Sequence, residues 1–164
     1  MKKIILLFVA ALAVSCSSDS ESSNANFESS LVVDGIAFKP NRGTYGSTNG
    51  QVEGQTGTFF AMQKMNGNQL EQALYINVLY PIGSAGPEGE FDFGPGTSDQ
   101  FLANASFSDG QAGYVLTGTS VTVTQLADDE FRFTFNDPVA LLMSEGFAEK
   151  PMSGTVRAKL AFTE

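Results

Sequence analysis

Apolar and polar residues alternate with a period of two along most of the chain. In residues 70–80, the even positions from Leu74 to Tyr80 share one face, while Tyr75 and Leu79 lie opposite, so this strand is expected to be covered on both sides. Successive side chains of a β-strand point to opposite faces, and the pattern therefore predicts strands. The same alternation recurs in residues 88–93, 101–107, 114–125, 131–135 and 154–162.

Short polar links separate these segments. Asp34 and Gly35 lie between apolar residues and predict a hairpin, because a type I′ turn needs two residues that tolerate positive φ. Residues 66–68, Asn-Gly-Asn, and residues 127–130, Ala-Asp-Asp-Glu, predict two further turns. Clean alternation with short links is typical of an antiparallel sheet with one solvated face.

About eight to ten short strands in one domain predict an all-β fold, either a single antiparallel β-sandwich or a flattened barrel. One segment departs from the alternation. Asp137 and Pro138 match a helix N-cap and first-turn proline, and Gly146 a stop, which predicts one short helix near residues 138–145 or else an irregular loop. Residues 43–57 have little apolar content and are expected to form an exposed loop or a weak edge strand.

Residues 1–15 have the features of a signal peptide. A positive start at Lys2 and Lys3 precedes an apolar run over residues 4–14, which is too short for the ~20 residues of a spanning helix. The run ends in Leu-Ala-Val-Ser-Cys, which is similar to the lipobox of bacterial lipoproteins. That resemblance implies cleavage before Cys16 and a membrane anchor of acyl chains, such as palmitate, on its thiol. The alternative is an ordinary secretory signal with a cysteine near the cut.

Residues 17–26 are polar throughout and predict a flexible tether between lipidated Cys16 and a single β-domain of residues 27–164. The residue after the cysteine, Ser17, is not the aspartate that resembles an inner-membrane retention signal, which favours the outer membrane. The Ser/Asp/Glu-rich tether also resembles that of surface-exported lipoproteins of Bacteroidota. Surface exposure is therefore favoured over a periplasm-facing position, which stays open.

Composition excludes several classes of function. The chain has 164 residues, a net charge of −9, no His, no Trp and one Cys. Without His there is no His-based triad or metal site, and a single Cys excludes an intrachain disulfide. Nucleic acid is not an expected partner, because 9 basic side chains face 18 acidic ones. No Walker loop or dinucleotide-binding glycine pattern occurs, and no cofactor is expected.

Several motifs together resemble a group of small lipoproteins of Bacteroidota without a characterised function. Residues 33–38, Val-Asp-Gly-Ile-Ala-Phe, match the hairpin that opens the domain in that group, and residues 89–93 match a mid-chain strand loosely. Residues 118–124, 131–135 and 153–156 follow in the same order. The resemblance implies an all-β fold and brings no catalytic or binding residues, and residues 137–150 depart from the group's simpler pattern.

Acidic side chains are the remaining candidates for chemistry. Glu88, Glu90 and Asp92 occupy one face of a predicted strand, where they are weak candidates for a Ca²⁺ site or an acid/base pair. Asp99 lies beyond a Gly-Pro turn and is a further weak metal candidate, whereas residues 128–130 lack the spacing of a dedicated calcium loop. The simpler interpretation is the solvated face of a half-buried strand.

These observations favour a non-catalytic binding or interaction module of the cell envelope over an enzyme. Its partner would be a glycan, a peptide, a small ligand or another lipoprotein. The alternatives are a lipocalin-like carrier of a small apolar ligand, a structural protein of the envelope, or a glycan hydrolase that uses carboxylates alone. The four Tyr and surface Phe are the stacking platforms for a sugar, although core or rim packing is expected for most of them.

Protease shaving of intact cells tests the predicted surface exposure. We expect the domain to be removed from intact cells, because the polar tether and the lipid anchor would leave it outside the outer membrane. The measurement is an immunoblot of cells before and after protease, with a periplasmic protein as the control. A chain that stays protected would contradict surface display and leave the anchor intact.

Overall fold

The computed structural model describes residues 26–49 and 53–164, and these residues form an all-β fold, as predicted. The signal peptide, Cys16 and most of the tether lie outside the described residues. None of the described residues belongs to a helix long and apolar enough to cross a membrane. The strands are β1 Phe27–Ser29, β2 Val32–Val33, β3 Ile36–Ala37, β4 Arg42–Asn49, β5 Gln55–Asn66, β6 Gln69–Pro81, β7 Gly89–Phe93, β8 Leu102–Ser108, β9 Gly113–Thr117, β10 Ser120–Ala127, β11 Glu130–Asn136, β12 Val139–Leu142, β13 Ala148–Ser153, β14 Thr155–Lys159 and β15 Ala161–Phe162.

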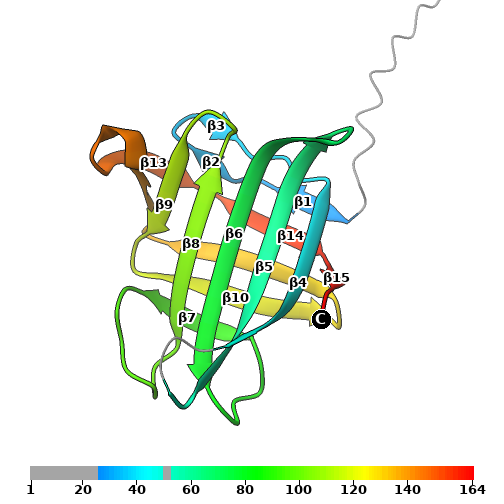
Figure 1. Ribbon diagram of the computed structural model, residues 1–164, viewed down its shortest axis with the longest axis vertical. Helices are drawn as coiled ribbons and strands as arrows, with labels where there is room; N and C mark the ends of the chain where they lie inside the picture. Colours follow the sequence, from blue (N-terminus) through cyan, green and yellow to red (C-terminus); the bar gives the residue numbers. More distant parts are fainter. Residues whose placement is uncertain (1–25, 50–52) are drawn as a thin grey trace, which may run out of the picture.

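The strands form two layers that cross each other (Figure 1). In the front layer β9, β8, β6, β5 and β4 lie side by side, and β10, β11 and β14 run across behind them. Strand pairing links the two layers at both sides. On one side β7 pairs with β8 of the front layer and with β10 of the back layer. On the other side the chain continues from β14 of the back layer through Leu160 into β15, which pairs with β4 of the front layer. The arrangement is consistent with the predicted sandwich or flattened barrel.

Strand number and direction differ from the prediction. The described residues contain fifteen strand segments instead of eight to ten, because several segments of two or three residues break off where the chain bends toward a new partner. Two contacts, β7 with β8 and β15 with β4, are parallel in a sheet predicted to be antiparallel throughout. Alternation reports which face a residue occupies but carries no information on the partner strand or its direction.

The helix predicted near residues 138–145 is largely wrong. Residues Val139–Leu142 form β12, which pairs with β9 on one side and β13 on the other, and only Met143–Glu145 form a 3₁₀ turn. A helix of two turns is unstable by itself, and pairing with two strands supplies the backbone hydrogen bonds instead. For residues 43–57 the strand alternative agrees with the structure, since the described residues contribute to β4 and the start of β5, and β4 pairs beyond β5 with only two residues of β15.

The predicted turns are confirmed. Asp34 and Gly35 have φ of 50° and 79°, as a type I′ turn requires, and connect β2 to β3. The β5–β6 hairpin closes at the pair Asn66–Gln69, with Gly67 at φ 59°. The β10–β11 hairpin closes around the acidic residues 128–129.

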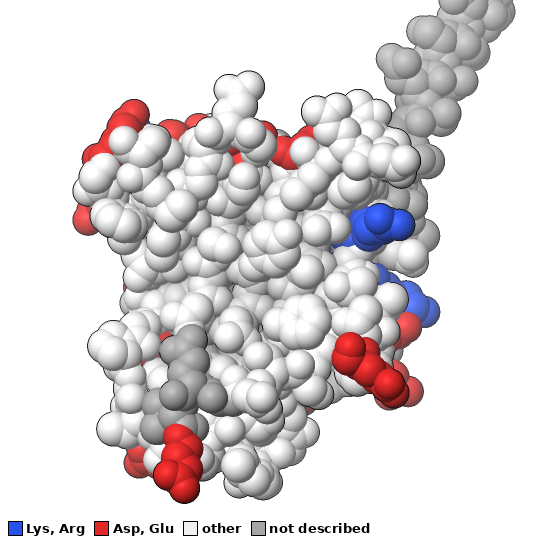
Figure 2. All heavy atoms as spheres, viewed as in Figure 1, with Lys and Arg blue, Asp and Glu red and all other residues white. Residues whose placement is uncertain are grey.

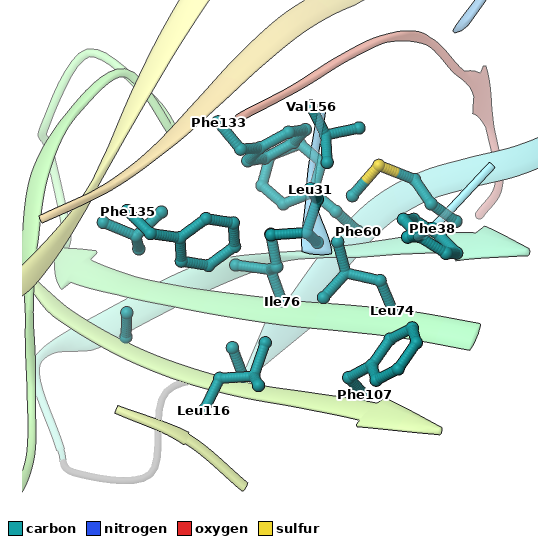
Figure 3. Close-up of a cluster of buried hydrophobic side chains, with 14 of the residues drawn as sticks. Leu31, Phe38, Phe60, Leu74, Ile76, Phe107, Leu116, Phe133, Phe135 and Val156 are labelled. Carbon is teal, nitrogen blue, oxygen red and sulfur yellow. The ribbon is translucent and has the colours of Figure 1, made fainter. Parts of the chain in front are cut away.

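The core between the layers is rich in phenylalanine (Figure 3). Phe60 of β5 meets Phe131 and Phe133 of β11 edge-on, with ring centroids 5.1 and 4.9 Å apart. These rings come from opposite layers, so their contact holds the layers together. Among the described residues, six phenylalanines have a relative exposure below 2%, and they are Phe38, Phe60, Phe91, Phe107, Phe131 and Phe133.

Truncating one of these rings tests the role of the interlayer contact. We expect Phe133→Ala to lower the free energy of unfolding by about 3–5 kcal/mol, because it leaves a cavity between the layers. The matched control is Leu126→Ala on β10, whose side chain is 39% exposed and whose truncation should cost no more than about 0.5 kcal/mol. Urea unfolding followed by circular dichroism measures both, and equal losses would contradict the assigned core.

Candidate functional site

The outer face of the back layer carries charge. Outward positions of β1, β11 and β14 bear Glu28, Glu130, Arg132 and Arg157. The Arg157 guanidinium donates to Glu130 and lies 3.3 Å from Glu28. The hydrogen bond to Glu130 is the main cause that raises the pKa of Arg157. Exposed ion pairs of this kind add little stability, and they keep this face hydrated.

The front layer presents an outer face almost without charge (Figure 2). Strand register assigns its members, since Phe60, Ile76 and Ala105 are buried and point inward while their neighbours along each strand point out. We call this surface the neutral face, and of its outward positions only Arg42, at one edge, is charged. Its members are Arg42, Thr44, Gly46, Thr48, Gly57, Phe59, Ala61, Gln63, Ala73, Tyr75, Asn77, Leu79, Leu102, Asn104, Ser106, Ser108, Gly113, Val115 and Thr117.

A loop over residues 94–101 covers the lower part of the neutral face. Gln55 Nε2 donates to the carbonyl oxygens of Thr97 and Gln100, at 3.1 and 3.3 Å. Leu79 and Leu102 point outward yet are only 2% and 7% exposed. The loop can come this close because it has glycine at position 96, where a Cβ would lie 2.6 Å from the Leu102 side chain. Only the upper part of the face remains open.

The open part contains a shallow depression of about 250 Å³. Asn77 lies at its centre, paired with Phe59 of β5 on one side and Asn104 of β8 on the other. Tyr75, two residues before Asn77 on β6, pairs with Ser106 and is 43% exposed. We call this feature the Tyr75 depression, and the outward side chains that line it are Phe59, Tyr75, Asn77, Asn104 and Ser106.

Neighbouring residues hold the aromatic walls of the depression. Gln63 Nε2 donates to Tyr75 Oη at 3.3 Å and so orients the phenol. A Cβ at Gly46 would lie 2.8 Å from the Phe59 ring, so glycine there allows the ring to lean over β4. Asn77 Oδ1 is buried and has no hydrogen-bond partner among the described residues. A buried acceptor without a donor costs free energy, which leaves this amide ready to accept a hydrogen bond.

The other tyrosines are packed, as expected for most of these aromatics. Tyr80 bonds to Thr58 through its hydroxyl at 2.9 Å, and Tyr114 donates to Asp34 at 3.3 Å. Tyr45 is partly buried and packs against Phe60 and Phe131. The expectation that the β6 strand is covered on both sides is correct for Leu79 and wrong for Tyr75. Sequence reasoning had placed both on the same face but could not foresee that the loop would cover only one.

The acidic candidates do not gather into a site. Glu90 accepts hydrogen bonds from Ser120 and Asn136, and Asp99 accepts one from Thr97, which lowers the pKa of Asp99. The side chains of all four candidates, Glu88, Glu90, Asp92 and Asp99, are exposed. Within residues 26–49 and 53–164, no group of three or more acidic, His or Cys side chains could hold a metal ion. The alternation of Glu88, Glu90 and Asp92 therefore marks the solvated side of β7.

The comparisons with known proteins add no assignment to this geometry. No family model matches the chain, and no curated protein or solved structure matches it significantly. The candidate site thus rests on the neutral face and its depression alone.

A calcium titration tests the placement of the acidic side chains. We expect Ca²⁺ up to about 5 mM to leave the thermal unfolding midpoint unchanged, because scattered exposed carboxylates do not replace the hydration shell of the ion. Differential scanning calorimetry with MgCl₂ at equal ionic strength as the control measures this. A saturable rise in the midpoint that Asp92→Asn removes would show that the carboxylates form a site.

Proposed function

We propose that this chain is a lipid-anchored lipoprotein of the outer membrane whose β-domain recognises a partner at the neutral face and catalyses no reaction. The observation that carries the proposal is the contrast between the two outer faces. On a chain with a net charge of −9, one broad face is almost free of charge and exposes an aromatic ring beside two amides. An uncharged face loses less free energy than a charged one when a partner displaces its water.

The anchor follows from the N-terminal sequence. The lipobox-like residues 12–16 end at Cys16, and two or more acyl chains there would hold the protein at the membrane almost permanently, since each buried methylene contributes about 0.8 kcal/mol. The polar residues 17–26 would span about 17–20 Å as a flexible coil, which exceeds the ~8 Å Debye length at physiological salt. An acidic domain can therefore sit clear of a negatively charged membrane surface.

The contents of the core favour surface recognition over a lipocalin-like carrier. A carrier needs an apolar cavity between its layers. Here the rings of Phe60, Phe131 and Phe133 meet in that space at contact distance. A ligand would have to displace them, at a cost of several kcal/mol.

The placement of the carboxylates speaks against a glycan hydrolase. Such enzymes hold two carboxyl groups about 5–10 Å apart on either side of a bound sugar. Glu90 is bonded to Ser120 and Asn136 on the outer side of β7, and no acidic side chain lines the Tyr75 depression. We therefore propose binding without hydrolysis.

Site-specific photo-crosslinking tests the use of the neutral face without assuming a partner class. A benzophenone amino acid replaces Ser106 on the neutral face or Thr124 on the outer face of β10, in the full chain on intact cells. We expect adducts from position 106 only, because the partner would cover this face. Gel shifts and mass spectrometry detect protein and glycan adducts alike. Equal adducts from both positions, or none from position 106, would refute the proposal.

The anchor needs its own control in the same cells. We expect Cys16→Ser to leave the membrane fraction, because the variant has no thiol to acylate. Immunoblots of the separated fractions measure this. A variant that stays in the membrane would refute the lipid anchor without bearing on the neutral face.

A further inference from the structure

The lining of the Tyr75 depression restricts the charge of what can bind there. None of its five outward side chains carries a charge at neutral pH. A charged ligand would give up water there without gaining an opposite charge, which is unfavourable. The chain's net charge of −9 additionally repels anions. The occupant is therefore expected to be neutral.

The polar groups of the depression restrict the chemistry further. Asn77 and Asn104 face each other across neighbouring strands, and Ser106 adds a hydroxyl. A purely apolar ligand would remove water from these groups and leave their hydrogen bonds unmade. The ligand must therefore offer both donors and acceptors to amides, including a donor for Asn77 Oδ1.

Tyr75 and Phe59 supply the third requirement. Tyr75 is 43% exposed, and the phenol is oriented by Gln63. An exposed aromatic ring favours a flat partner with C–H groups on one side, since the ring face carries partial negative charge. A pyranose combines such a C–H face with a rim of hydroxyls and has no net charge.

We propose that the Tyr75 depression binds a neutral saccharide, with one pyranose ring against Tyr75 and hydroxyls bonded to the amides of Asn77 and Asn104. The inference rests on the proposed function, because it names the class of partner at the same face. Asn77 Oδ1 is buried in this structure, so its proposed hydrogen bond to a ligand hydroxyl requires the Asn77 side chain to turn toward the ligand. The chain has no Trp, so Tyr75 is the exposed aromatic ring of this depression against which a pyranose can stack.

A second copy of the chain is the main competing occupant. Two sheets that stack face to face interdigitate apolar side chains. On the open part of the neutral face, Gln63, Asn77, Asn104, Ser106 and Ser108 would instead be buried against their own copies. Each of these polar groups would need a matching partner on the opposing flat face, whereas a small ligand can place its hydroxyls to suit them.

Saturation-transfer difference NMR on the full chain in detergent micelles tests the saccharide. The probes are cellohexaose, mannohexaose and maltohexaose, with hexagalacturonate as the charged comparison. We expect transfer to ring C–H protons of at least one neutral oligomer and none to the charged one. Because no charge takes part, the dissociation constant should stay constant between about 0.05 and 0.5 M NaCl.

Variants locate the binding. We expect Tyr75→Ala to raise the dissociation constant of the neutral oligomer about tenfold or more. Tyr75→Phe should raise it no more than about threefold, because the ring remains. Asn104→Ala should raise it by an intermediate factor. Phe147→Ala is the matched control, because this aromatic side chain is 57% exposed on the distant β12–β13 hairpin. This variant should bind the oligomer with the same dissociation constant as the unchanged chain. Circular dichroism confirms that each variant is folded.

The outcomes separate this inference from the proposed function. No transfer to any neutral oligomer, or binding that Tyr75→Ala leaves unchanged, overturns the saccharide. If position 106 nevertheless crosslinks to an envelope protein, the proposed function stands and the saccharide is wrong. A concentration-dependent dimer in analytical ultracentrifugation that Asn77→Lys abolishes would assign the face to a second copy and overturn the saccharide as well.

Discussion

The packing of Phe60 against Phe131 and Phe133 is the contact on which the rest of the structure depends. It joins the middle of β5 to β11, two strands that are not paired with each other, and so presses the front layer onto the layer that crosses behind it. Buried aromatic rings contribute large apolar areas and fill the space between the sheets. Once these rings face inward, the alternation of the strands forces their neighbours onto the outer faces.

The two outer faces that result have different chemistry. Behind, Arg157 and its acidic partners Glu28 and Glu130 remain hydrated. In front, the loop over residues 94–101 already covers the lower part of the neutral face, with Gln55 bonded to the loop's carbonyls. An uncharged surface can be covered at little electrostatic cost, and the chain itself uses this property below the Tyr75 depression. The upper part of the neutral face, which remains open, can be covered by a ligand at the same low electrostatic cost.

Local signals in the sequence were sufficient where the interaction is local. The Asp34-Gly35 turn follows from two adjacent residues that tolerate positive φ, and the inward and outward positions of β6 follow from alternation. The same reasoning failed for residues 138–145, where a plausible cap and stop surround residues that β9 and β13 recruit into β12. For Glu88, Glu90 and Asp92 the simpler interpretation, a solvated strand face, agrees with their exposed positions, although alternation alone does not distinguish such a face from a cluster that binds an ion.

The sequence by itself therefore determined the all-β class, the turns, the inward positions of Phe131 and Phe133 and the acidic, His-free chemistry of the chain. It also placed Tyr75 and Leu79 on one face, since both are odd positions of one strand. Only the tertiary structure decided that Leu79 is covered and Tyr75 is open, and that Asn77 lies beside Asn104. The physical reason is that the side a residue occupies is set by its neighbours in the chain, whereas its partners and its cover come from residues far away in sequence.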